Sequence, residues 1–192
     1  MELTNIFLSE HLKLTEIDPK LDGETESGWM LDLDYARQRS SNPVRPKAAK
    51  EVQNDLEEKL KESNEGRRSF YYAIRAKQED GELVGFLYLD SIEWKNGQGF
   101  LRLLFKDEDT TAQYMTESLQ LALRYAFDEL NLYHVCMELS DYALAAIRVV
   151  EDAGFMLEVC LREIIYREGQ HHDRLIYGLL AQEWRKAKEM QA

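Results

Sequence analysis

A strand, a turn, a helix and a second strand succeed one another between Phe100 and Leu139, and this succession constrains the fold more than any other part of the chain. The apolar run 100–105 predicts the first strand. From Thr111 to Leu130, apolar residues recur every three or four positions, as on the buried face of an amphipathic helix. The run 132–139 predicts the second strand. Because parallel strands are joined by a long crossover, usually a helix, we expect these two strands to be parallel neighbours.

The turn at residues 106–109 is where a ligand is expected in such a unit, since the first amides of a helix have no partner within it. Three consecutive carboxylates begin at Asp107. Like charges about 8 Å apart in water repel by only about half a kcal/mol, and by more when they are partly desolvated. Thr110 and Gln113 have the spacing of a capping box, which would satisfy the amides that an anion otherwise binds. This stretch therefore favours a self-capped helix over a phosphate site.

The remaining segments predict a sheet covered by helices. An edge strand is expected towards the end of residues 5–17, where apolar residues alternate. Ser140 or Asp141 would cap a later helix, and Gly154 would end it in the left-handed conformation. The other expected elements are helices at 22–39, 48–63, 142–153 and 181–190, strands at 68–76, 82–92, 155–167 and 171–179, turns at 78–81, 95–98 and 168–170, and a proline-containing loop at 40–46.

This order of elements predicts an α+β fold, in which a mixed α/β-type sheet carries helices on its faces. The chain has 192 residues, which is enough for one proper core. We therefore expect a single domain over residues 1–192.

Charge and hydropathy restrict the partners. The formal net charge of −12 disfavours a general nucleic-acid partner and an anionic membrane surface, and it would suit a basic substrate. No apolar stretch approaches the roughly 18 residues of a membrane span. The first residues show no basic region followed by a long apolar run, so a cytoplasmic location is expected.

The cysteines and histidines give no metal signature. Cys136 and Cys160 lie in apolar, strand-like stretches and are expected to be buried free thiols. The neighbours His171 and His172 would point to opposite faces of a strand. We therefore expect no metal site.

Several motifs in this order resemble the GNAT acetyltransferase superfamily, with the greatest likeness to its ribosomal-protein and spermidine N-acetyltransferase branch. The motifs are residues 83–86, 92–94, 123–132, 146–155 and 161–180. The resemblance covers nearly the whole chain. It implies a sheet of about seven mostly antiparallel strands with a central parallel pair, and acetyl transfer from acetyl-CoA to a primary amine.

The same resemblance implies where acetyl-CoA would lie. In that family the cofactor enters between the two central parallel strands, and its pyrophosphate rests on backbone amides of a glycine-rich turn. The corresponding cofactor-binding residues are Leu103, Leu104, Phe105, Thr110, Thr111, Ala112, Gln113, Tyr114 and Met115.

The chain departs from the family pattern at five positions. Thr110 stands where the family has a basic or amide residue, and Gln113 and Met115 stand at two small positions. A phosphate must approach bare backbone there, and a Cβ blocks that approach. Ala143 replaces a frequent Asn, and Val150 replaces a frequent Tyr that protonates the departing CoA thiolate.

Three residues are candidates for the chemistry of acetyl transfer. Glu93 and His134 are candidate bases, and Tyr142 lies near the element that would hold the missing acid. Each also has a structural interpretation. Glu93 would be a surface acid of a hairpin, and His134 a hydrogen-bonded histidine on a half-buried strand.

Two functions follow, and the sequence leaves both open. The first is a GNAT-family N-acetyltransferase that acts on a small-molecule or peptide amine, with a cationic acceptor favoured by the charge. The second is a catalytically inactive GNAT-fold module that has lost acetyl-CoA binding and contacts a protein partner. A homodimer formed through an exposed edge strand near the C-terminus is a third, weaker interpretation.

Overall fold

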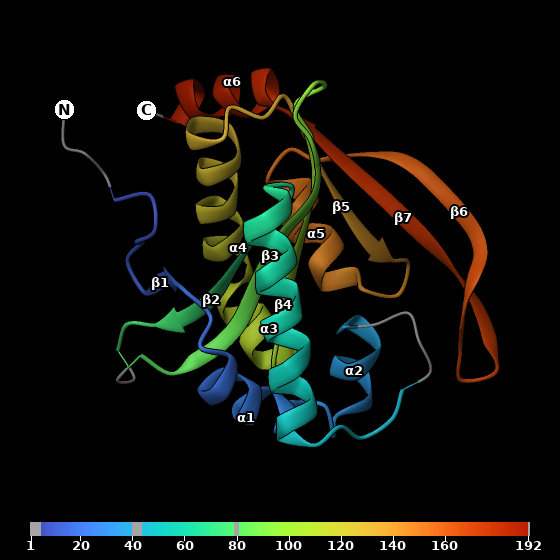
Figure 1. Cartoon of the computed structure of the whole chain (residues 1–192). Coiled ribbons are helices and arrows are strands. Elements are labelled where there is room, and N and C mark those ends of the chain that lie inside the picture. The colour runs from blue at the N-terminus through green and yellow to red at the C-terminus, as the bar shows by residue number, and fades with distance from the viewer. Residues whose placement is uncertain (1–4, 40–43, 79–80, 192) are drawn as a thin grey trace. The chain divides into compact units, whose positions relative to one another are not determined.

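The strands form a seven-stranded sheet in the order β1-β2-β3-β4-β5-β7-β6 (Figure 1). The structure, a computed structural model, describes residues 5–39, 44–78 and 81–191. β4 and β5 are parallel, whereas β1 with β2, β5 with β7, and β6 with β7 are antiparallel. This arrangement confirms the predicted mixed sheet with a parallel pair.

The elements are bounded as follows. The strands are β1 Leu12–Thr15, β2 Phe70–Ala76, β3 Leu83–Glu93, β4 Gln98–Phe105, β5 His134–Ser140, β6 Met156–Arg167 and β7 Gln170–Leu180. The helices are α1 Pro19–Trp29, α2 Leu33–Arg39, α3 Ala49–Gly66, α4 Glu108–Arg124, the π-helix η1 Tyr125–Glu129, α5 Leu144–Asp152 and α6 Ala181–Gln191.

The chain forms two compact units, both of which include parts of β3 and β4. The first unit comprises the described residues up to 88 together with 103–121. The second unit comprises 89–102 and the described residues from 122 onwards. The predicted loop at 40–46 and turn at 78–81 fall partly on residues 40–43 and 79–80, which lie outside the described residues.

The helix predicted for residues 22–39 is wrong, because two helices occupy this stretch. Asp18 begins α1 by accepting hydrogen bonds from the amides of the next turn, with Pro19 at the first helical position. Asp32 begins α2 in the same way, with Oδ1 accepting from the amides of Asp34 at 2.8 Å and Tyr35 at 3.0 Å. Asp32 therefore starts a new helix within a stretch that the apolar spacing alone predicts to be one helix.

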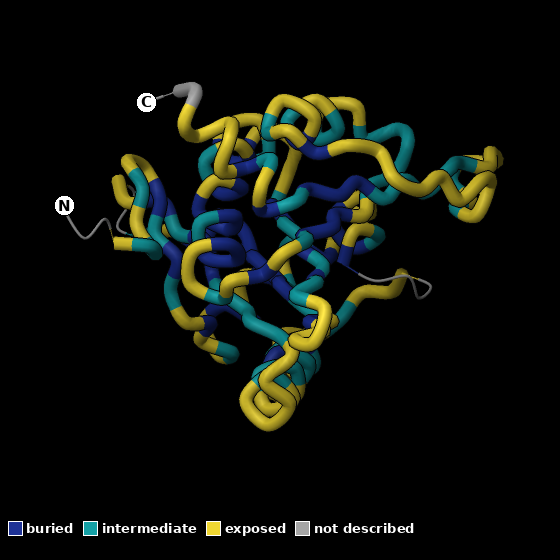
Figure 2. Tube along the Cα trace, turned by 90° about the horizontal axis from the view of Figure 1, so that it is seen from above, coloured by how far each residue is buried: buried dark blue, intermediate teal, exposed yellow. Residues whose placement is uncertain are grey.

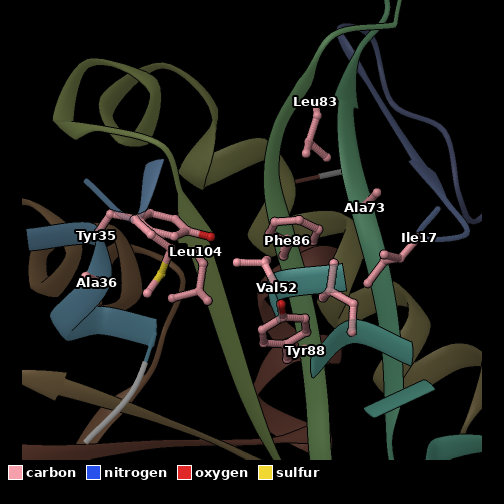
Figure 3. Close-up of a cluster of buried hydrophobic side chains, with 11 residues drawn as sticks. Ile17, Tyr35, Ala36, Val52, Ala73, Leu83, Phe86, Tyr88 and Leu104 are labelled. Carbon is pink, nitrogen blue, oxygen red and sulfur yellow. The ribbon is translucent and has the colours of Figure 1, made fainter. Parts of the chain in front are cut away.

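The core of the first unit is built from aromatic and branched side chains of α1, α2, α3 and the sheet (Figure 3). Trp29 lies edge-on to Tyr35 and Phe86, with ring centroids 5.4 and 5.9 Å apart. Such edge-to-face pairs stabilise a core beyond the area that they bury. The fully or nearly buried members of this core are Ile17, Met30, Tyr35, Ala36, Val52, Leu56, Ala73, Leu83, Phe86, Tyr88 and Leu104.

The central helix starts earlier and ends differently than the sequence predicts. α4 begins at Glu108, not Thr111, so the connection from β4 consists of Lys106 and Asp107 alone. At the other end the helix widens into η1, where the amide of Leu130 donates to the carbonyl of Tyr125 at 3.0 Å. That bond spans five residues, as in a π-helix, whereas an α-helix uses four.

The second unit contains the parallel ladder and the C-terminal hairpin. The ladder runs from Gln98 opposite His134 to Leu101 opposite Met137. Gly154, with φ +96°, follows α5 in the left-handed conformation that the sequence predicts. The C-terminal hairpin is long, and β6 is exposed along almost its whole length (Figure 2).

The predictions for the two cysteines of the second unit have different outcomes. Cys136 is a buried free thiol, as predicted, but Cys160 is exposed on β6. The apolar neighbours of Cys160 in the sequence are themselves exposed, which is why their pattern misleads.

Among the residues that the structure describes, no helix is long and apolar enough to cross a membrane.

Candidate functional site

The start of α4 is capped by Asp107 and not by the predicted pair of Thr110 and Gln113. Oδ1 of Asp107 accepts a hydrogen bond from the amide of Thr110 at 2.8 Å. The carbonyl oxygen of Asp107 accepts from the amide of Thr111 at 3.0 Å and from its hydroxyl at 2.7 Å. Desolvation raises the pKa of Asp107, but the hydrogen bonds from Thr110 and the charge of Lys106 outweigh it and lower the pKa. The sequence therefore predicts the capping residue three positions too late, at Thr110 and not at Asp107.

The residues assigned to the cofactor turn divide into buried and exposed positions within the first unit. Thr110, Tyr114 and Met115 are buried, whereas Ala112 and Gln113 are exposed. From Thr111 onwards these residues lie inside α4, where amides bond to carbonyl groups four residues earlier. A cradle of free amides at Thr111–Met115 therefore does not fit this backbone. Leu104 and Phe105 are buried at the end of β4, and Leu103 beside them is partly buried.

Glu93 ends β3 and is exposed. Its Oε2 accepts a hydrogen bond from the side-chain amide of Asn96 at 3.0 Å, across the turn to β4. This contact is the one expected of a surface acid in a hairpin.

His134 begins β5 and lies in a small cluster of polar side chains. Its Nε2 is 3.0 Å from Oε1 of Glu158 and 3.6 Å from Sγ of Cys136. Gln98, opposite His134 in the parallel ladder, points its side-chain amide at the same sulfur, 3.7 Å away. Burial raises the pKa of Cys136, the amide of Gln98 lowers it, and Glu158 raises it again, so that the pKa is above the ordinary value.

Tyr142 lies beside His172, which the sequence does not mark as a candidate for the chemistry. The ring of His172 stands edge-on to Tyr142, with centroids 4.9 Å apart, and the guanidinium of Arg167 lies 4.7 Å from the Tyr142 centroid. Nδ1 of His172 is 3.1 Å from Oδ1 of Asp141, whose Oδ2 accepts from the amide of Asp173 at 3.0 Å. An aspartate that holds one ring nitrogen fixes the histidine's tautomer, which leaves a lone pair on Nε2 of the neutral ring.

This Asp141–His172 pair corrects the predicted cap of α5. Neither Ser140 nor Asp141 caps that helix, because the N-cap position is Ala143 and no side chain bonds to the helix start there. The carboxylate of Asp141 contacts His172 and Asp173 on β7 instead. The chain positions of Asp141 and His172 gave no signal, since 31 residues separate them and only the antiparallel pairing of β5 with β7 brings them together.

Val150, where the resemblance expects a tyrosine, is fully buried on α5. Glu151, the next residue along α5, is bonded to a tyrosine from the sheet. Tyr177 on β7 donates its hydroxyl to Oε1 of Glu151 at 3.0 Å, and desolvation together with Glu151 raises its pKa.

The fold and the sequence both match known acetyltransferases. The spermidine N-acetyltransferase of Vibrio cholerae, solved with CoA and spermine, superposes with a TM-score of 0.75 at 17% identity, over 92% of this chain and 99% of that one. RimL, a ribosomal L7/L12 alpha-N-protein acetyltransferase solved with CoA, gives a TM-score of 0.74 at 20% identity, over 90% and 95%. At these identities the likeness shows the fold.

Sequence comparison carries the assignment further. The proposed ribosomal N-acetyltransferase YdaF of Bacillus subtilis is 31% identical to this chain over 111 residues. The match covers 57% of this chain and 60% of YdaF, so the chain spans about three fifths of that relative's length. Residues 12–156 match the family described as the acetyltransferase (GNAT) domain. Because that match covers well over half of the sequence, the chain belongs to the GNAT acetyltransferase family.

Proposed function

We propose that this protein transfers an acetyl group from acetyl-CoA to the primary amine of a small molecule or a peptide. The observation that carries the proposal is the family match over residues 12–156. Two structural neighbours are named for the acetylation of spermidine and of a ribosomal protein, and both were solved with CoA. The net charge of −12 favours a cationic acceptor such as a polyamine or a basic N-terminal peptide.

The residues of this chain would contribute mainly by moving protons. Acetyl-CoA supplies the thioester. The amine nitrogen attacks the thioester carbonyl carbon, the carbon–sulfur bond breaks, and the CoA thiolate leaves. The amine must give up a proton, and a positioned base speeds such a step by about 10²- to 10⁴-fold. We propose His172 as that base, because Asp141 holds its Nδ1 and leaves Nε2 to accept the proton.

Tyr142 and His134 remain proposals with different roles. Tyr142 packs on the edge of His172 and would donate the proton that the CoA thiolate takes up. His134 is one of the two bases that the sequence predicts, and its Nε2 faces Glu158. Glu93 is the third proposed base, and its exposed hairpin position makes it the least favoured of these residues.

The proposed cofactor contact at the start of α4 has a weak structural basis. Asp107 takes up the amide of Thr110, and the helix itself takes up the amide of Thr111. Any CoA binding must therefore use other contacts than a ring of free amides at Thr110–Met115.

Calorimetric titration with acetyl-CoA, at low and at moderate salt, tests the proposal first. We expect binding in the micromolar to sub-millimolar range. Turnover is then measured as release of the CoA thiol with spermidine, spermine and basic N-terminal peptides as acceptors. Absence of both binding and turnover at millimolar acetyl-CoA would overturn the acetyltransferase proposal.

Histidine variants then locate the base. His172→Gln should lower kcat by about a hundredfold. Asp141→Asn should also lower it, because it removes the acceptor that fixes the tautomer and orientation of the ring. His171→Gln, an exposed neighbour on the same strand, is the matched control and should have no effect. Loss of activity in His134→Gln, with full activity in His172→Gln, would assign the base to His134 and refute our choice.

The second candidate function is a binding module without catalysis. It is favoured by the capped start of α4 and by the buried Val150 in place of an acid. In that case acetyl-CoA would give neither heat nor a shift in Tm. Affinity capture that returns one protein partner in stoichiometric amounts would then support the module.

A further inference from the structure

His134, Cys136 and Glu158 bring three different metal-ligand atoms together in the second unit. The ligand atoms of the three side chains all lie within 4.8 Å of one another. His134 and Cys136 are two residues apart on β5, so they point to the same face of the sheet. Glu158 comes from β6, two strands away in the order β5-β7-β6.

A bulge and a glycine allow Glu158 to cross the intervening strand. The register between β6 and β7 shifts between Leu157 and Val159, which makes Glu158 the irregular residue of the pair. Gly178 on β7 lies opposite Cys136 in the ladder. A Cβ on Gly178 would lie 2.3 Å from Cδ and Oε1 of Glu158. The carboxylate thus occupies the space above Gly178 that any other residue would fill.

Two of the three separations between the ligand atoms are close to those of a tetrahedral zinc centre, and the third, between Cys136 Sγ and the Glu158 carboxylate, is within 4.8 Å. Zinc bonds of about 2.0 Å to nitrogen or oxygen and about 2.3 Å to sulfur, at tetrahedral angles, place nitrogen and sulfur about 3.5 Å apart and nitrogen and oxygen about 3.3 Å apart. The corresponding separations here are 3.6 Å from His134 Nε2 to Cys136 Sγ and 3.0 Å from Nε2 to Glu158 Oε1.

We propose that His134, Cys136 and Glu158 form a binding site for zinc in which the fourth coordination position is open. The mixed sulfur, nitrogen and oxygen set suits Zn²⁺ and disfavours Mg²⁺ and Ca²⁺, which prefer oxygen ligands. Three protein ligands with one free position are the arrangement of catalytic rather than structural zinc sites. The proposal departs from the expectation of no metal site, which rested on sequence spacing alone.

The hydrogen bond from Gln98 to Cys136 favours a metal-binding thiolate over a simple hydrogen bond between His134 and Glu158. The side-chain amide of Gln98 donates to the sulfur, as donors around metal thiolates commonly do. Binding replaces the proton of the Cys136 thiol, which goes to solvent. It also moves the His134 proton to Nδ1, so that Nε2 offers its lone pair.

The test is a titration of the whole chain, after chelator treatment, with ZnCl₂ and separately with CoCl₂. We expect one metal ion per chain, and for cobalt the charge-transfer absorption of a thiolate ligand. Cys136→Ser should abolish that absorption, while Cys160→Ser, which removes the exposed second cysteine, should keep it. His134→Gln should lose binding, and His171→Gln should retain it.

Gly178→Ala tests the geometry without touching a ligand. The added methyl group meets the flexible end of Glu158, so the variant should fold and its carboxylate should be displaced. We expect zinc affinity to fall about tenfold or more, as for other changes that misplace a ligand. Glu158→Gln, on an exposed strand position, is the companion variant and should lose at least as much affinity.

Three outcomes would refute the site. They are no stoichiometric metal binding, binding that survives Cys136→Ser, or unchanged affinity in both Gly178→Ala and Glu158→Gln. Because metal binding is measured without acetyl-CoA or an acceptor, failure here is distinct from failure of the proposed acetyltransferase activity.

Discussion

Oδ1 of Asp107 accepts a hydrogen bond from the amide of Thr110 at 2.8 Å, and this contact decides what the start of α4 offers to a ligand. An amide that is already bonded within the protein binds an anion only if the aspartate moves away. A carboxylate is also the worst capping group for a site that would hold a pyrophosphate.

Two variants of Asp107 separate its capping role from its charge. Asp107→Ala removes the cap and should lower the free energy of unfolding by about 1 kcal/mol. Asp107→Asn keeps an oxygen acceptor and should cost much less. It should strengthen acetyl-CoA binding about twofold at low salt, because about half a kcal/mol of repulsion is removed. Calorimetry at two salt concentrations checks this, and a gain that persists at high salt would contradict the charge explanation.

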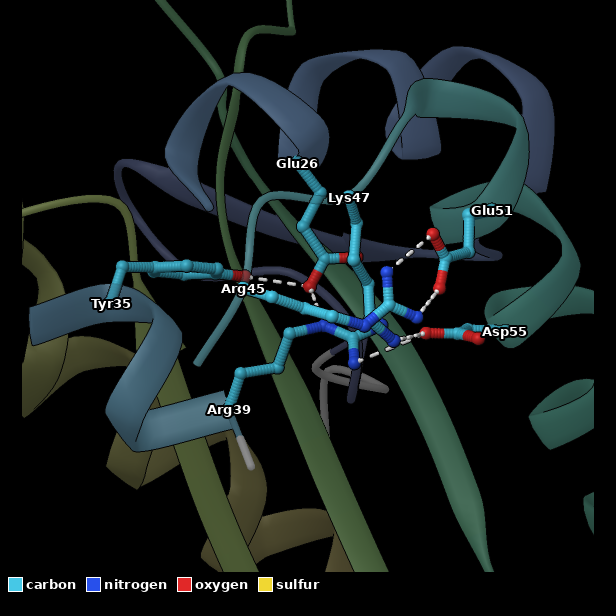
Figure 4. Close-up of polar contacts among 7 residues, drawn as sticks. All are labelled: Glu26, Tyr35, Arg39, Arg45, Lys47, Glu51 and Asp55. Atoms are coloured by element: carbon cyan, nitrogen blue, oxygen red, sulfur yellow. Dashed lines mark hydrogen bonds and ion pairs between the residues drawn. The ribbon is translucent and has the colours of Figure 1, made fainter. Parts of the chain in front are cut away.

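The buried ion pair between Glu26 and Arg39 predicts a large loss of stability (Figure 4). Glu26 Oε1 lies 2.5 Å from Nε of Arg39 and 2.9 Å from the hydroxyl of Tyr35, and Glu26 is fully buried. Burial lowers the pKa of Arg39, but Glu26 outweighs that effect and raises it. Glu26→Gln leaves the buried guanidinium with only the partly exposed Asp55 as counter-charge, 3.7 Å from Nη1. The loss of the buried partner should cost up to about 3–5 kcal/mol.

Urea denaturation measures that loss, and an exposed ion pair provides its control. Arg45, exposed and paired with Glu51, is the matched position. Arg45→Ala should leave the midpoint of unfolding unchanged, as for most exposed ion pairs. Equal losses at both positions would contradict the assignment of the effect to burial.

Glu117 should contribute stability only above acidic pH. Its Oε1 accepts from the amide of His11 at 2.8 Å, and its Oε2 lies 3.2 Å from Nδ1 of the same residue. Desolvation raises the pKa of Glu117, but hydrogen bonds from Ser9 and His11 lower it below the ordinary 4.5. Because the folded pKa is the lower one, the contribution is complete above about 4.5 and disappears as the pH falls through the folded value.

Glu117→Gln should therefore be less stable than the parent by about 1 kcal/mol near pH 7. The difference should shrink towards zero as the pH falls below 4.5. Thermal unfolding of both proteins across this range measures it. A difference that stays constant with pH would show that hydrogen-bond geometry and not ionisation is responsible.

Two glycines should respond to alanine with opposite signs. Gly154 has φ +96°, so Gly154→Ala should lower the free energy of unfolding by about 1–2 kcal/mol. Gly28 lies in α1 with no atom within 4 Å of a built Cβ. Gly28→Ala should raise the free energy of unfolding by about 0.5–1 kcal/mol, because alanine loses less backbone entropy in a helix. Calorimetric melting of the two variants checks both signs, and stabilisation by Gly154→Ala would refute the backbone argument.

The sequence predicts the large-scale fold well because hydrophobic period and turn chemistry act locally. The parallel strands around α4, the Asn-Gly turn at 95–98 and the left-handed Gly154 are all read from a few neighbouring residues. Element starts are harder to predict. Asp32 and Asp107 look like ordinary surface acids in the sequence, and each proves to be the cap that sets where a helix begins.

The candidate sites could be predicted only in part, since they depend on pairings between distant strands. The elements on which they lie mark His134 and Tyr142 as candidates, but nothing in the sequence marks their partners Glu158 and His172. Glu158 reaches His134 because of a bulge in β6 and a missing side chain at Gly178, neither of which has a local signature. Cys160 was misplaced for a related reason, because β6 carries apolar residues on an exposed strand.

The irregularities of β6 also govern how this edge of the sheet can meet another chain. β6 ends the sheet, and its register against β7 shifts twice, the second time between Leu161 and Ile165. At that second shift Glu163 has φ +57°, and its amide is turned to Asp173. A foreign strand would find matching donors and acceptors only over short stretches. These irregularities therefore make it harder for another chain to pair with β6 and aggregate, although the apolar side chains of β6 are exposed.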